Sequence, residues 1–97
     1  MTDMDENSPV FAIAVAAELS DMHPQTLRQY DRLGLVVPGR TRGGSRRYSM
    51  RDIAQLREIA RLGSAGVSLE GIRRVLALEN ENKDLRDRVR ALETALA

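Results

Sequence analysis

Two adjacent segments decide the fold of this chain: His23-Pro24-Gln25-Thr26-Leu27-Arg28-Gln29-Tyr30 and Arg40-Thr41-Arg42-Gly43-Gly44-Ser45-Arg46-Arg47-Tyr48. The first begins with a proline that suits the first position of a helix, where no backbone N–H is needed. Its apolar residues recur at helical spacing, so Leu27 and Tyr30 should face a core, with Leu33 as a third candidate. In the second segment, arginines flank Gly43-Gly44, a pair typical of a two-residue hairpin turn. We therefore expect a helix followed by a basic hairpin.

A shorter helix should precede this pair. Residues 15–19 (Val-Ala-Ala-Glu-Leu) have a small-residue helical composition, and residues 21–23 read as a turn. The apolar stretch 11–13 before them fits either a strand or the start of a helix. Gly34 is well placed to end the second helix in the left-handed conformation, with Leu35 closing the cap. The order helix, turn, helix predicts a helix-turn-helix.

Two more helices should follow the hairpin. Ser49 and Asp52 form a capping box with Asp in place of Glu, Gly66 ends that helix, and Ser68 caps the next. Apolar residues at helical spacing predict that both helices contribute to the core. These residues are Ile53, Leu56, Ile59, Ala60 and Gly63 in the first helix, and Leu69, Ile72, Val75 and Leu76 in the second.

The C-terminal segment has a heptad pattern. Apolar residues alternate at spacings of three and four, with Asn82 as a polar residue at an a position. An isolated helix of this length is marginal in water, so its stripe must be buried on its own domain or on a second copy. We favour a self-dimer. The predicted dimerisation residues are Asn82, Leu85, Val89, Leu92 and Leu96, which continue from Val75 and Leu78.

Charge is distributed unevenly, although the net charge is only +1. Residues 1–22 contain acidic side chains and no Lys or Arg, whereas residues 32–51 contain arginines and no acid. A basic block of this kind attracts an anionic partner, with a solvated arginine-rich loop as the alternative. The arginines are Arg32, Arg40, Arg42, Arg46, Arg47 and Arg51.

Several classes of function are not expected. There is no Cys and one His, which rules out disulfides, thiolate metal sites and His clusters. Neither a phosphate loop, a Ser/His/acid set nor a buried pair of carboxylates is recognisable, so we expect no enzyme, no metal and no cofactor. No apolar run approaches the ~20 residues of a membrane span, and the acidic start is not a signal peptide. A cytoplasmic location is therefore expected.

Double-stranded DNA is the anionic partner that fits both segments. A helix in the major groove needs polar side chains near its N-terminus, where Arg can pair with guanine and Gln with adenine. Arginines of a hairpin can contact the phosphate backbone of the DNA. The predicted reading residues are Gln25, Thr26, Arg28, Gln29 and Tyr30, of which Tyr30 is equally well explained as core. The predicted wing residues are Arg40, Arg42, Gly43, Gly44, Arg46, Arg47 and Tyr48.

The fold class that follows is a mainly α, winged helix-turn-helix DNA-binding domain with a C-terminal coiled-coil helix. We divide the chain into a disordered acidic tail (1–9), the winged domain (10–78) and a dimerisation helix (79–97).

Linked motifs along residues 10–78 resemble the MerR family of bacterial transcription regulators. The motifs are Phe11-x-Ile13-x-x-x-Ala17, Thr26-Leu27-Arg28-x-Tyr30-Asp31-Arg32-Leu33-Gly34-Leu35, Arg46-Arg47-Tyr48-Ser49-x-x-Asp52, Leu56-x-x-Ile59-x-x-Leu62 and Gly66-x-Ser68-Leu69-x-x-Ile72. The resemblance implies homodimerisation through an antiparallel coiled coil and binding to inverted-repeat operators at the bacterial nucleoid. It also implies that helix 24–33 reads the major groove while wing 39–48 grips the flanking DNA.

Within the family, residues 15–36, 40–49 and 71–80 look most like the heat-shock repressor branch, HspR. That similarity implies repression of chaperone operons with the Hsp70 chaperone DnaK as corepressor. The family's common Arg-Tyr-Tyr-Glu is Arg28-Gln29-Tyr30-Asp31 here, and His23 replaces the usual small cap. Without cysteines or a ligand domain, sensing of metals, redox state or drugs is not expected. The coiled coil ends abruptly at Ala97, which fits a truncated chain whose missing tail would bind the chaperone.

Two alternatives stay open from the sequence. The same winged fold suits an architectural or excision-type DNA binder without sequence preference. A protein-interaction adaptor would use the coiled coil and never touch nucleic acid.

Overall fold

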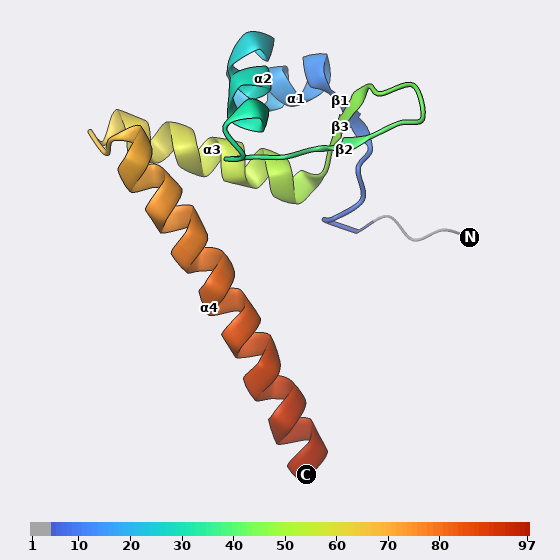
Figure 1. The fold of residues 1–97 in the computed structure, drawn as a ribbon, viewed down its shortest axis with the longest axis vertical. Coiled ribbons are helices and arrows are strands. Elements are labelled where there is room, and N and C mark those ends of the chain that lie inside the picture. Colours follow the sequence, from blue (N-terminus) through green and yellow to red (C-terminus); the bar gives the residue numbers. More distant parts are fainter. Residues whose placement is uncertain (1–4) are drawn as a thin grey trace.

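The computed structural model describes residues 5–97 and confirms a mainly helical fold with a small sheet (Figure 1). The elements in chain order are β1 (Phe11–Ala12), α1 (Ile13–Ser20), α2 (Pro24–Arg32), β2 (Gly39–Arg40), β3 (Arg46–Tyr48), α3 (Met50–Ser64) and α4 (Leu69–Leu96). The strands form one antiparallel sheet in the order β1-β3-β2, in which Phe11 pairs with Tyr48 and Arg40 with Arg46. The apolar stretch 11–13 is thus a short strand that runs directly into α1.

The ends of α2 follow local rules. Pro24 occupies its first turn, and Nδ1 of His23 accepts a hydrogen bond from the Gln25 backbone N–H at 3.0 Å. His23 therefore caps the helix as a smaller polar residue would. At the other end Gly34 has φ +72°, and the Leu35 N–H donates to the Tyr30 carbonyl at 2.8 Å. Both predicted ends of α2 are confirmed.

Ser49 and Asp52 form the predicted capping box at the start of α3. The Asp52 N–H donates to Ser49 Oγ at 3.0 Å, and the Ser49 N–H donates to Asp52 Oδ2 at 2.9 Å. Two backbone donors that would otherwise lack partners are satisfied.

Replacing the capping side chain should therefore be costly. Ser49→Ala is expected to lower the free energy of unfolding by about 1 kcal/mol, measured by urea denaturation. Ser64→Ala, at an exposed position in the last turn of α3, is the control and should change it little. Equal losses in the two variants would contradict the capping role.

The core lies where α1, α2, α3, the sheet and the start of α4 meet. Its buried members come from all of these elements and from the loop after α2: Ala16, Ala17, Leu27, Val36, Tyr48, Ile53, Leu56, Ile59, Ile72 and Leu76. Ala60, Gly63 and Leu69, predicted to be buried, are exposed, because Leu62 and Val67 pack against the core at this end. Leu33 is also exposed, at 38%, since it lies in the turn after α2.

The wing turn differs from the predicted two-residue hairpin. Three residues, 42–44, connect Thr41 to Ser45, whose carbonyl accepts from the Thr41 N–H at 2.9 Å. The Gly44 N–H donates to the Thr41 carbonyl, and Gly44 has φ +86°. A turn followed by a left-handed glycine is the usual three-residue hairpin connection. Only Gly44 of the glycine pair needs the left-handed region.

One backbone hydrogen bond joins residues 5–9, part of the tail predicted to be disordered, to the start of α3. The Asn7 N–H donates to Asp5 Oδ1 at 2.8 Å, and the Glu6 carbonyl accepts from the Arg51 N–H at 2.9 Å. That N–H is in the first turn of α3 and has no partner within the helix. The rest of the predicted tail, residues 1–4, lies outside the described residues.

α4 is one continuous helix of 28 residues, so the proposed domain boundary at residue 78 falls inside it. Figure 1 shows it leaving the N-terminal elements as an isolated rod. Within residues 5–97, no helix has the length and apolar character needed to cross a membrane.

Candidate nucleic-acid interface

α2 presents a polar face to solvent. Gln25 and Gln29 are exposed, Thr26 and Arg28 are half-buried, and Arg28 Nη1 donates to Gln25 Oε1 at 3.4 Å. Tyr30 is partly buried and packs against the core. The structure thus favours the core interpretation for Tyr30 and leaves the other four predicted reading residues accessible.

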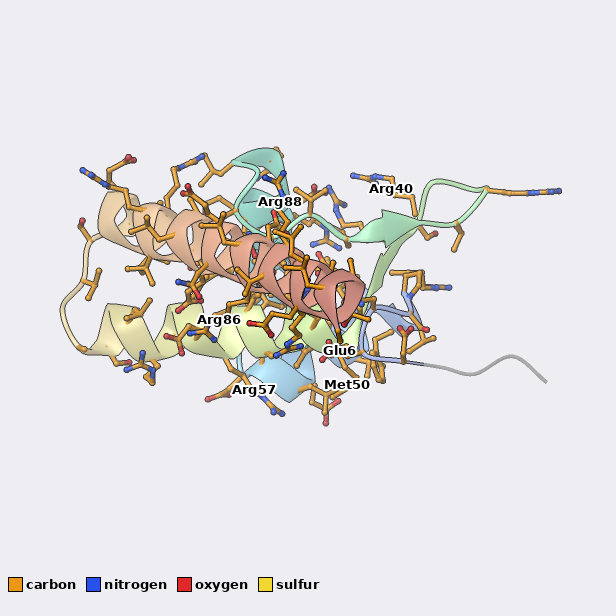
Figure 2. The ribbon with its side chains drawn as sticks, turned by 90° about the horizontal axis from the view of Figure 1, so that it is seen from below. Glu6, Arg40, Met50, Arg57, Arg86 and Arg88 are labelled. Atoms are coloured by element: carbon orange, nitrogen blue, oxygen red, sulfur yellow. The ribbon has the colours of Figure 1, made fainter. Side chains whose placement is uncertain are left out.

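The loop between β2 and β3 projects from the domain (Figure 1), and the wing arginines lie on this loop and on the two strands. Arg42, Gly43 and Gly44 are exposed at its tip, and Arg46 and Arg47 are half-buried on β3. Arg40, labelled at the base of the wing in Figure 2, is exposed on β2 and its Nη1 donates to the Gly44 carbonyl at 3.0 Å. This hydrogen bond connects β2 to the tip of the wing.

Asp31, near the end of α2, joins this helix to the wing. Its Oδ2 lies 2.8 Å from Arg40 Nη2 and 2.7 Å from Arg46 Nε. The sequence distinguishes Asp31 only as a departure from Arg-Tyr-Tyr-Glu and predicts no role for it. An acidic residue beside a run of arginines was the available signal.

α2 and the wing share a hollow of about 270 Å³. Arg28 lines it from the helix and Arg46 and Arg47 from β3, and it contains no acidic residue in its lining. The start of α1 also borders it, where Ala12 makes no side-chain cap. Guanidinium groups and backbone N–H groups at a helix start both favour anions such as phosphate.

Tyr48 was predicted to contact DNA, and the structure corrects this. Its side chain is completely buried, because β3 alternates and directs Tyr48 to the core after the half-buried Arg47. Burial raises the pKa of the phenol, which therefore stays neutral. Its hydroxyl has no hydrogen-bond partner among the described residues.

Tyr48→Phe should accordingly leave DNA affinity unchanged within about twofold, a difference well below 1 kcal/mol. The free energy of unfolding should stay equal or rise, because an unpartnered buried hydroxyl is removed. Urea denaturation and a DNA titration of the same sample measure both. Strongly reduced affinity at normal stability would restore Tyr48 as a contact.

The predicted dimerisation residues occupy the free part of α4. Leu85 and Val89 are each 52% exposed, Leu92 63% and Leu96 86%, so this stripe is not packed on its own domain. Asn82 borders a hollow of about 800 Å³ beside α4, together with Val75 and Leu78. Among residues 5–97, no cluster of three or more His, Asp or Glu side chains could hold a metal ion.

The sequence that forms α2 and the wing is similar to that of a known protein family. The family profile described as MerR HTH family regulatory protein matches residues 11–79, which contain both α2 and the wing. The chain belongs to the MerR family. Residues 11–79 form the helix-turn-helix domain that this family of regulatory proteins shares.

Two relatives are similar to this MerR-family chain over most of its length. Heat shock protein HspR of Streptomyces coelicolor is 53% identical over 95 residues, which are 97% of this chain and 63% of HspR. The transcriptional regulator GlnR of Bacillus anthracis is 31% identical over 84 residues, 87% of this chain and 65% of GlnR. The chain thus spans less than two thirds of either relative.

Solved MerR-family structures share the fold. The N-terminal part of MtaN, the Bacillus subtilis multidrug transporter activator, matches with a TM-score of 0.64 at 25% identity, over 89% of this chain and 91% of that structure. HiNmlR, a MerR family regulator lacking the sensor domain and bound to promoter DNA, matches with a TM-score of 0.61 at 28% identity, over 89% of this chain and 77% of that structure.

Proposed function

We propose that this protein is a sequence-specific repressor of heat-shock and chaperone genes that binds inverted-repeat operators as a homodimer. The observation that carries DNA reading is the shared hollow, which Arg28 of α2 and Arg47 of the wing both line. A helix that reads bases and a wing that holds the backbone would then act on adjoining parts of one site. The 53% identity to HspR supports the heat-shock role.

The exposed stripe on α4 supports the homodimer. Burying a leucine or valine side chain contributes about 1.5–3 kcal/mol, and four members of the stripe are at least half-exposed: Leu85, Val89, Leu92 and Leu96. A second α4 of the same sequence would cover them. Asn82 would then lie at an a position, where a polar residue specifies the register and the number of helices. Two-fold symmetry of the protein would match two-fold symmetry of the operator.

The similarity to HspR is also the basis for proposing DnaK as a corepressor and the bacterial cytoplasm, at the nucleoid, as the place of action. No residue of the described chain is assigned to chaperone binding.

Selection of bound sites tests this function. The protein is incubated with a random-sequence duplex library and with promoter fragments of chaperone operons, with and without DnaK. We expect enrichment of an inverted repeat, retention of the promoter fragments, and tighter retention with DnaK. Retention without a shared motif would support an architectural or excision-type binder. No retention at micromolar protein would support the adaptor, and no effect of DnaK would remove the corepressor.

A further inference from the structure

One carboxylate ties the recognition helix to both strands of the wing. Asp31 Oδ2 accepts from Arg40 Nη2 of β2 at 2.8 Å and from Arg46 Nε of β3 at 2.7 Å. Arg40 continues the connection to the Gly44 carbonyl near the wing tip at 3.0 Å. The orientation of the wing relative to α2 therefore depends on Asp31.

These ion pairs differ from ordinary surface pairs, which contribute little. The Asp31 side chain is only 10% exposed and that of Arg46 is 21% exposed. Charge-assisted hydrogen bonds shielded from water are stronger than neutral ones and hold a defined geometry. Arg40 is about half-exposed, so its bond should be the weaker of the two.

The same carboxylate opposes simple electrostatic attraction to DNA. It places a negative charge among the wing arginines and neutralises two of the four. Among the described residues, Arg42 and Arg47 make no ion pair and stay available for phosphates. A wing that worked by charge alone would bind DNA better without Asp31, so its contribution must be to geometry.

We propose that Asp31 is a positioning residue that determines DNA specificity. It holds the wing so that Arg47 and Arg28 face the same hollow, and it withholds Arg40 and Arg46 from sequence-independent binding of phosphates. The inference rests on the proposed sequence-specific binding of DNA.

The test compares two duplexes of equal length: the inverted repeat recovered by selection and a scrambled sequence. Asp31→Asn should bind the scrambled duplex more tightly, with a salt dependence steeper by about one to two units because each arginine released to a phosphate adds ~0.9. Its preference for the selected duplex should fall about tenfold, the scale expected from losing charge-assisted hydrogen bonds. A merely structural role would lower the active fraction and leave the salt slope unchanged.

Three further single variants and one double variant separate the effect of geometry from that of charge. Arg46→Lys keeps the charge but lacks the planar guanidinium, so the preference should fall here too. Asp31→Glu keeps the carboxylate and should retain most of the preference. Asp84→Asn makes the same charge change on an exposed part of α4 and should leave the preference intact. In the double variant Asp31→Asn/Arg46→Lys, the two losses should not add, because both break one interaction.

The inference is overturned if Asp31→Asn keeps the wild-type preference or shows a shallower salt slope. Should Asp31→Asn fail to fold by circular dichroism, Arg46→Lys decides the same question. A wild-type protein that binds the two duplexes equally contradicts the proposed function instead, so the two failures are distinguishable.

Discussion

Leu85→Asp should convert the protein to monomers and weaken binding to an inverted repeat by about 100-fold or more, because linked half-site binding is lost. Leu85 lies in the middle of the exposed stripe of α4, where a second copy would bury it. A carboxylate at this position would have to be buried in an apolar seam without a partner. Light scattering measures the mass, and a titration with the selected duplex measures the affinity.

Ala91→Asp is the matched control. It introduces the same charge on the same helix at an exposed position outside the heptad stripe, so mass and affinity should stay close to wild type. The folded monomer should be equally stable in both variants, since neither position is buried in one chain. A wild-type protein that is monomeric both free and on DNA would contradict the dimer.

Arg28→Ala should weaken binding to the selected duplex by about 1–3 kcal/mol and relax the preference at one base pair. Its guanidinium lies on the exposed face of α2 beside Gln25, where base edges would be read. Arg47→Ala should instead weaken binding to all sequences and reduce the salt slope by about one unit. Titrations of both variants against single-base substitutions of the duplex separate reading from gripping.

Arg74→Ala, at an exposed position near the start of α4, controls for the loss of one positive charge. It should change neither preference nor salt slope. If Arg28→Ala and Arg47→Ala both behave like this control, the assignment of DNA contacts is wrong.

Features set by neighbouring residues were predictable from the sequence. Pro24 and Gly34 bound α2 because one lacks an N–H and the other adopts positive φ without strain. The hydrogen bonds between Ser49 and Asp52 span three residues. Such rules need no knowledge of the rest of the fold, which explains why these helix ends were placed correctly.

Features that depend on contacts between residues far apart in the sequence were not predictable from it. Tyr48 shares the arginine-rich segment with true wing residues, and only the pairing of β3 with β1 shows that it points into the core. Asp31 meets arginines 9 and 15 residues away, a contact that depends on how the wing folds back on α2. Ala60 and Gly63 match the helical period, yet in the last part of α3 it is Leu62 that packs against the core.

We propose above all that this MerR-family chain reads a DNA sequence. Competition between the selected inverted repeat and a scrambled duplex of the same length, at one stated salt concentration, tests it most directly. We expect the protein to prefer the selected duplex by about a thousandfold or more, as sequence-specific regulators do. A ratio of affinities near one would contradict sequence-specific binding.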